Sequence, residues 1–244
     1  MRISIIGYGR MGHEIEKTAV ARGHEIAAAV DGETDFVTKA EMIKGSDVAI
    51  EFSTPLTAAA NISRCFHLGL PVVCGTTGWY EHLPEIKELC IKGGGAFLYA
   101  SNFSIGMNFM FRLNMEMADF AKRYGYDMSI TETHHIHKID RPSGTAVTLA
   151  NGILEKSDRY SCWKSVCECG TTSENELPVK SIREGDVFGI HEIDALGKCD
   201  KISLRHEAFS RTGFAIGAVI AAEFIHNRRG VFTMNDVIAA GTSR

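Results

Sequence analysis

A glycine-rich turn near the amino terminus constrains the fold of this chain more than any other feature. The turn matches Gly-x-Gly-x-x-Gly and consists of Gly7, Tyr8, Gly9, Arg10, Met11 and Gly12. It follows a short apolar run at residues 3–6, and a helix is expected over residues 10–21. In such a strand–turn–helix context the glycines permit a tight turn, close approach of a pyrophosphate and close helix packing. The turn therefore predicts a dinucleotide site at the start of this helix.

Strands and helices are expected to alternate through the first part of the chain. Short apolar runs predict further strands at residues 25–30, 47–52, 71–74 and 96–99, with helices at 56–68 and 81–92 between the later ones. This alternation favours an open parallel sheet with helices on both faces.

Asp31 stands at the end of the second expected strand. A carboxylate about 20 residues after the glycine turn can accept hydrogen bonds from the adenosine ribose hydroxyls. The same charge repels a 2′-phosphate, and Gly32 supplies no cation beside it. We therefore expect NADH or NADPH as the cofactor, with NADH favoured.

The pattern changes after residue 103. A helix is expected at 109–123, a strand at 128–132, and strands at 181–189, 190–196 and 201–208 that alternate like an antiparallel sheet. Helices return at 214–226 and 233–240. We predict an α/β protein: a Rossmann-type, dinucleotide-binding domain over 1–103 and 212–244, and an inserted α+β, substrate-binding domain over 104–211 with a mainly antiparallel sheet.

A histidine-rich segment carries the strongest chemical signal. His134, His135, His137 and Lys138 fall within five positions, and Pro142-Ser143-Gly144-Thr145 follows them as an expected helix start. Imidazole titrates near neutral pH, lysine supplies a cation, and free N–H groups at a helix start bind carboxylates. Two alternatives stay open at this point: a metal site that includes Glu132, or a solvated loop without chemistry.

Composition excludes several classes of protein. The net charge of −4 and a pI near 6.2 give no general attraction to nucleic acid or to anionic membranes. The apolar stretch at 214–225 is interrupted by Glu223 and falls short of the roughly 20 residues of a spanning helix. Without a secretory signal pattern, the chain is expected to be cytoplasmic.

The seven cysteines are odd in number and scattered, which is typical of reduced thiols. Cys162, Cys167 and Cys169 lie close together, but no pair has Cys-x-x-Cys spacing. We therefore predict no metal there and assign the cluster no function.

Residues 132–146 resemble the signature of the dihydrodipicolinate reductase family. The family pattern is Glu-x-His-His-x-x-Lys-x-Asp-x-Pro-Ser-Gly-Thr-Ala, and every fixed position is met. The resemblance covers nearly the whole chain and includes residues 9–12, 52–55, 75–78, 101–104 and 217–219. The glycine turn is one residue shorter here than in many relatives. This difference bears on the geometry of the loop and not on the expected function.

The resemblance implies roles for individual residues. His134 would be the general acid–base group and Lys138 the proton donor to the reacting ring. His135 would contact the substrate, and Ser143, Gly144 and Thr145 would belong to its binding site. Gly75, Thr76 and Thr77, with Ala100, Ser101, Asn102 and Phe103, would line the cofactor cleft.

The resemblance also implies NAD(P)H-dependent reduction of 4-hydroxy-tetrahydrodipicolinate, a small dicarboxylate, in lysine biosynthesis. It implies a homotetramer assembled through the sheet of the second domain. Two other functions are weighed against this one. An amino-acid dehydrogenase of the aspartate pathway would share the glycine turn but would not need the histidine-rich segment. A nucleotide sensor without turnover would need a degraded catalytic segment or an added interaction module.

Overall fold

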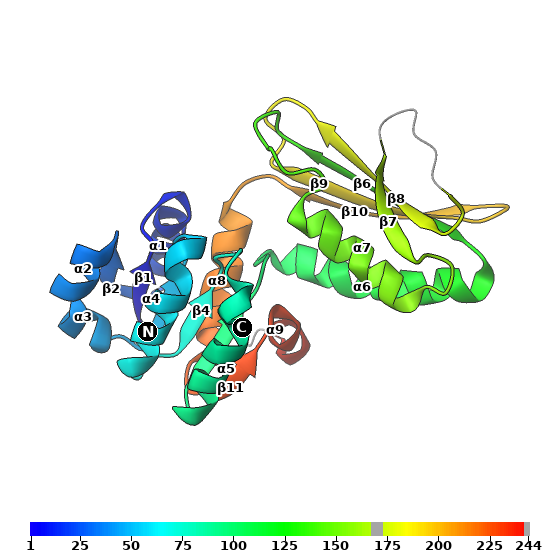
Figure 1. The fold of residues 1–244 in the computed structure, drawn as a ribbon. Helices are drawn as coiled ribbons and strands as arrows, with labels where there is room; N and C mark the ends of the chain where they lie inside the picture. The colour runs from blue at the N-terminus through cyan, green and yellow to red at the C-terminus, as the bar shows by residue number, and fades with distance from the viewer. Residues whose placement is uncertain (167–172, 242–244) are drawn as a thin grey trace. The chain divides into compact units, whose positions relative to one another are not determined.

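The computed structural model describes residues 1–166 and 173–241, and the chain divides into two compact units (Figure 1). Unit 1 comprises Met1–Ile105 and Arg211–Arg244, and unit 2 comprises Gly106–Ser210. Cys167 and Cys169 lie outside the described residues, whereas Cys162 is exposed. Within the described ranges, no helix is both long and apolar enough to cross a membrane.

Unit 1 is built on a six-stranded parallel sheet with the strand order β11-β5-β4-β3-β1-β2. The strands are β1 (Arg2–Ile6), β2 (Glu25–Val30), β3 (Val48–Glu51), β4 (Val72–Cys74), β5 (Ala96–Tyr99) and β11 (Gly230–Phe232). Ile3, Ile5, Val48 and Ile50 are fully buried. Continuous apolar strands of this kind are typical of parallel sheets covered on both faces.

Helices cover both faces of this sheet. The helices are α1 (Arg10–Ala21), α2 (Glu33–Thr38), α3 (Ala40–Lys44), α4 (Pro55–His67), α5 (Leu83–Lys92), α8 (Thr212–Ile225) and α9 (Met234–Ala240). One apolar cluster joins α1, α8 and α9 to Ile3 and Ile5, and a second joins α4 and α5 to Ile6. Alternate strand residues therefore serve different cores, as the two-residue period of a strand requires.

Unit 2 is a five-stranded sheet with the order β10-β9-β6-β8-β7 and two helices packed on it. The strands are β6 (Asp127–His134), β7 (Cys162–Val166), β8 (Glu176–Arg183), β9 (Gly189–Leu196) and β10 (Lys201–Ala208). The helices are α6 (Ile105–Tyr124) and α7 (Gly144–Lys156). β6 pairs antiparallel with β9 and parallel with β8, so the sheet is mixed.

The predicted fold class is confirmed, with differences in single elements. The strand expected at 181–189 runs instead over Glu176–Arg183 and is parallel to both of its neighbours. Alternation along a strand reports which face is buried and carries no information about strand direction. The short helices α2 and α3 and the three-residue strand β11 were not predicted from the sequence.

Candidate active site

The glycine turn of unit 1 has the geometry that its sequence predicts. Gly7 has φ +97°, and a Cβ there would lie 2.2 Å from the carbonyl oxygen of Phe52. A Cβ on Gly12 would lie 2.5 Å from the carbonyl oxygen of Gly7. Helix α1 begins directly afterwards, at Arg10, with no side-chain cap and no acidic residue in its first turn. The first N–H groups of α1 therefore suit a pyrophosphate, because they lack intrahelical partners and the helix dipole favours anions.

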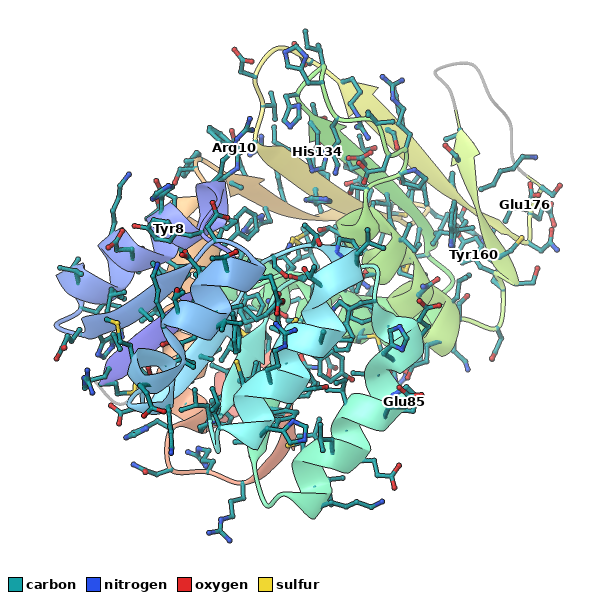
Figure 2. The ribbon with its side chains drawn as sticks, turned by 60° about the vertical axis from the view of Figure 1, so that its left-hand side comes forward. Tyr8, Arg10, Glu85, His134, Tyr160 and Glu176 are labelled. Carbon is teal, nitrogen blue, oxygen red and sulfur yellow. The ribbon has the colours of Figure 1, made fainter. Side chains whose placement is uncertain are left out.

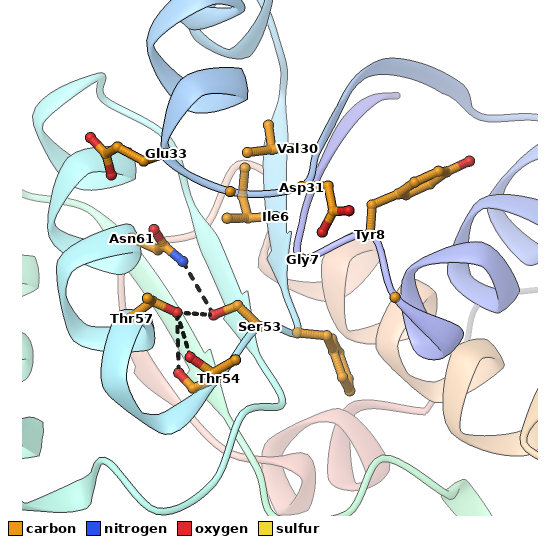
Figure 3. A pocket seen from close by; sticks show the side chains of 13 residues that line it. Ile6, Gly7, Tyr8, Val30, Asp31, Glu33, Ser53, Thr54, Thr57 and Asn61 are labelled. Carbon is orange, nitrogen blue, oxygen red and sulfur yellow. Dashed lines mark hydrogen bonds between the residues drawn. The ribbon is translucent and has the colours of Figure 1, made fainter.

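A cavity of about 350 Å³ opens beside this turn, at the carboxyl ends of β1, β2 and β3. It is lined by Ile6, Val30, Thr57, Asn61 and residues 7–9, 31–33 and 52–54 (Figure 3). Asp31 faces it from the segment after β2, and Ser53 and Asn61 lie on the other side. Open α/β sheets bind ligands at this edge.

Acidic groups surround the Asp31 side of the cavity. Glu33 lines the cavity and pairs with Arg64 at 2.5 Å. Asp35 accepts a hydrogen bond from the Asp31 N–H and pairs with Lys39 at 2.9 Å. The hydrogen bond from the Asp31 backbone N–H, followed by the side-chain hydrogen bond from Lys39 Nζ, lowers the pKa of Asp35. Both nearby cations are therefore already paired with carboxylates.

The other predicted cofactor residues do not line this cavity, although some of them contact residues that do. Arg10, Met11 and Gly12 lie in the first turn of α1. Arg10 is labelled in Figure 2. Gly75, Thr76 and Thr77 follow β4, and Ala100, Ser101, Asn102 and Phe103 follow β5. The Ser53 N–H donates to Thr76 Oγ1 at 2.9 Å, and the Phe52 and Phe103 ring centroids are 5.5 Å apart. Their roles in cofactor binding stay predictions.

In unit 2, three neighbouring strands bring ionisable side chains together around His134, which is labelled in Figure 2. Glu132 and His134 lie two residues apart on β6 and point to the same face of the sheet. The register places His191 of β9 opposite Glu132, and Arg183 of β8 opposite His134. His134 Nδ1 forms a short hydrogen bond with Glu132 Oε2, and Arg183 Nη2 lies 2.9 Å from Glu132 Oε1.

Glu132 is a buried, ionised carboxylate. Its exposed fraction is 0%. Burial alone would raise the pKa of Glu132, but the hydrogen bond with His134, followed by the Arg183 guanidinium beside it, holds that pKa at about 2. The carboxylate is therefore charged at neutral pH and only accepts hydrogen bonds.

His191 is the neutral member of the group. Its ring centroid lies 5.2 Å from that of His134, and its Nε2 lies 3.3 Å from Ser143 Oγ. Burial, reinforced by His134, lowers the pKa of His191 to about 3. His191 therefore adds no cation beside Arg183 at neutral pH.

We expect acid to destabilise the protein through His191. The unfolded chain binds a proton at His191 as the pH falls below about 6.5, whereas the folded chain does so only near 3. The free energy of unfolding should therefore fall by about 1–2 kcal/mol more between about pH 7 and about pH 5 in the wild type than in His191→Gln. Urea titrations at several pH values measure this difference. Equal slopes in both proteins would contradict the assignment of a neutral His191.

The loop between β6 and α7 carries the remaining predicted residues. His135 Nδ1 is buried, and the described residues give it no hydrogen-bond partner. Lys138 Nζ lies 2.8 Å from Asp140 Oδ1. Ser143 caps α7, because its Oγ accepts a hydrogen bond from the Ala146 N–H at 3.2 Å. Gly144 and Thr145 lie in the first turn of α7, and this turn contains no acidic residue. An unpartnered imidazole nitrogen and the backbone N–H groups of a helix start suit an anionic ligand.

The metal alternative is disfavoured by the charges of this site. The ligand atoms of Glu132, His134 and His191 all lie within 4.8 Å of one another. However, the Arg183 guanidinium already occupies one oxygen of Glu132, and His134 occupies the other. A divalent cation would have to displace one of these groups and would then lie beside a buried, permanent positive charge. Arg183 and His191 were missed by the sequence reasoning, because only the strand register brings them to Glu132.

A Rossmann-type unit joined to a smaller sheet unit is typical of pyridine-nucleotide oxidoreductases. Two family models together cover most of the chain and meet near the first boundary between the units, although the second also covers α8, β11 and most of α9 of unit 1. The model described as dihydrodipicolinate reductase, N-terminus, matches residues 1–103, and the C-terminus model matches residues 106–238. The chain belongs to the dihydrodipicolinate reductase family.

Known relatives agree with this assignment. The chain is 42% identical over 242 residues to a 4-hydroxy-tetrahydrodipicolinate reductase of Christiangramia forsetii, covering 98% of each chain. It is 35% identical over 201 residues to the protein of that name from Methanopyrus kandleri, covering 81% of this chain and 73% of the relative. The resemblance predicted from residues 132–146 is thus confirmed.

Solved structures with lower identity show the fold. A dipicolinate-bound dihydrodipicolinate reductase from Paenisporosarcina sp. TG-14 has a TM-score of 0.76 at 24% identity, covering 96% of this chain and 97% of the other. A C. glutamicum DAP dehydrogenase in complex with DAP has a TM-score of 0.55 at 12% identity, covering 99% and 96%. The fold is therefore shared with this dehydrogenase and does not by itself separate a dehydrogenase from a dihydrodipicolinate reductase.

Proposed function

We propose that this protein reduces 4-hydroxy-tetrahydrodipicolinate to tetrahydrodipicolinate with NAD(P)H, in the diaminopimelate route to lysine. The observation that carries the proposal is the histidine-rich segment. It is complete in sequence, and it folds into a buried Glu132–His134 pair beside Lys138 and the start of α7. An amino-acid dehydrogenase on the same scaffold would not need this arrangement.

Unit 1 would hold the cofactor, which supplies a hydride when bound. The backbone of the glycine turn and the first turn of α1 would bind the pyrophosphate. Asp31 would accept hydrogen bonds from the adenosine ribose. The absence of side chains at Gly7 and Gly12 fits this role, because a Cβ at either would overlap backbone.

Unit 2 would bind the substrate and supply the proton. His135, with its unpartnered Nδ1, and the N–H groups of Gly144 and Thr145 would bind the carboxylates. His134 would act as the general acid–base group and Lys138 as the proton donor to the ring. One hydride and one proton are added and one water is lost, so the reaction balances. The dipicolinate held by the Paenisporosarcina relative is also a ring dicarboxylate, which supports this substrate class.

The test is a coupled assay. A synthase generates the substrate from pyruvate and aspartate semialdehyde, and the loss of NADH absorbance reports reduction. We expect oxidation of NADH that depends on the synthase. If neither NADH nor NADPH is oxidised while cofactor binding persists, another dehydrogenase activity or a sensor becomes the better assignment.

The same assay measures cofactor preference. We expect kcat/KM with NADH to equal or exceed that with NADPH, because Asp31 and Glu33 surround the ribose end of the cavity with negative charge. Asp31→Ser removes one charge and should raise kcat/KM for NADPH relative to NADH by about fivefold or more. A wild-type preference for NADPH of about tenfold, or 1.4 kcal/mol, would contradict this prediction. From the family resemblance we also expect a cytoplasmic homotetramer.

A further inference from the structure

The Glu132 carboxylate determines which nitrogen of His134 carries the proton. Because an ionised carboxylate only accepts, the short hydrogen bond between Glu132 and His134 Nδ1 requires the proton on Nδ1. In the neutral ring, Nε2 is then the nitrogen that can accept a proton. A Cβ at Gly189 would lie 3.0 Å from His134 Nε2, so the glycine leaves space in front of this nitrogen.

Arg183 connects Glu132 to the loop that carries Lys138. Its side chain is only 3% exposed. Arg183 Nη2 lies 2.9 Å from Glu132 and donates to the Asp140 carbonyl oxygen at 2.5 Å, and Nε donates to the Lys138 carbonyl oxygen at 3.2 Å. The planar guanidinium fixes these directions relative to one another. One buried side chain therefore contacts both the partner of His134 and the backbone of Lys138.

The other groups around His134 do not neutralise the ion pair between Glu132 and Arg183. His191 of β9 is neutral at physiological pH, and burial lowers the pKa of His206, its neighbour on β10. Ser143 contacts His191, and Lys138 pairs with Asp140 at the loop.

We propose that Glu132 and Arg183 are positioning residues for the reduction. Glu132 holds the His134 proton on Nδ1 and leaves Nε2 as the reacting nitrogen, while Arg183 stabilises the carboxylate and holds the Lys138 loop. This assignment rests on the proposed function of His134 and Lys138, and it extends that function to two residues on separate strands.

Glu132→Gln tests the role of the carboxylate. The Arg183 guanidinium can only donate, so the oxygen of the introduced amide must turn toward Arg183 and its NH₂ group toward His134 Nδ1. The neutral ring then carries its proton on Nε2. We expect nitrogen NMR of the imidazole to report the Nδ1–H tautomer in the wild type and the Nε2–H tautomer in Glu132→Gln. We expect kcat to fall by about 10²-fold or more, with KM values within about threefold of wild type.

Arg183→Lys tests the link to the loop. Lysine keeps the positive charge but lacks the planar guanidinium that donates to the carbonyl oxygens of Lys138 and Asp140. We therefore expect kcat to fall about tenfold, while His134 keeps the Nδ1–H tautomer. The matched control is Arg205→Lys in the same sheet, where Arg205 is half exposed and pairs with Glu192 and Glu207. This control should keep wild-type kcat.

The His134 tautomer and kcat together separate this inference from the proposed function. If Glu132→Gln keeps both the wild-type tautomer and the wild-type kcat, the role of Glu132 is overturned. If Arg183→Lys matches Arg205→Lys in kcat, the role of Arg183 is overturned. If the wild type shows no turnover, the proposed function fails, and the NMR comparison still decides whether Glu132 sets the His134 tautomer.

Discussion

Replacing His134 with alanine is expected to lower kcat for the reduction by about 10²-fold to 10⁴-fold, because the substitution removes the group assigned to proton transfer. Lys138→Ala should cost about 10²-fold or more for the same reason. Losses in the double variant should be less than the product of the single losses, because the two residues serve one step. Steady-state kinetics with the coupled assay measure all three values.

Cofactor binding provides the internal reference for these variants. His134 and Lys138 belong to unit 2, whereas the glycine turn and Asp31 belong to unit 1, so the Kd for NADH should change by less than about twofold, or 0.4 kcal/mol. His137→Ala is the matched control, because His137 lies in the same loop, is exposed and has no assigned role. Since His134 is buried, His134→Gln keeps a polar side chain at that position in case the alanine variant unfolds. Full kcat in both His134 and Lys138 variants would remove their assigned roles.

Gly217→Ala is expected to lower the free energy of unfolding by about 3 kcal/mol, at the upper end of the usual cost of overpacking. Gly217 lies in α8, and a Cβ there would be 1.7 Å from the carbonyl oxygen of Phe103. That oxygen belongs to the backbone, so no side-chain rotation relieves the overlap. In a chain of this size the change corresponds to a decrease in Tm of about 6–12 °C.

Gly213 of the same helix is the control for this substitution. A Cβ on Gly213 meets nothing within 4 Å, so Gly213→Ala should be neutral or stabilise the protein by up to about 1 kcal/mol. Thermal unfolding of both variants measures the contrast. Equal Tm values would show that α8 does not pack on the Phe103 backbone as closely as the structure indicates. Phe103 contacts Phe52 at the cofactor cavity, so Gly217→Ala should also weaken NADH binding.

Local patterns were enough to predict the strand, glycine turn and helix at the start of the chain. The apolar run at Ile3–Ile6, the glycine turn and the following helix each depend on neighbouring residues, and the structure places all three as expected. The family resemblance of residues 132–146 could likewise be predicted locally, because Glu132, His134 and Lys138 are close in the chain. Turn geometry, helix starts and the period of buried residues are all encoded over a few residues.

The long-range partners were beyond such patterns. Arg183 and His191 reach Glu132 only because β8 and β9 flank β6 in a particular register. The parallel direction of β8 and the addition of β11 to the first sheet likewise depend on distant strands. A strand's sequence specifies which face is buried but leaves open which strand lies beside it and in which direction. The local sequence therefore indicates His134 as a candidate for proton transfer, whereas the buried groups around it come together only once the sheet has formed.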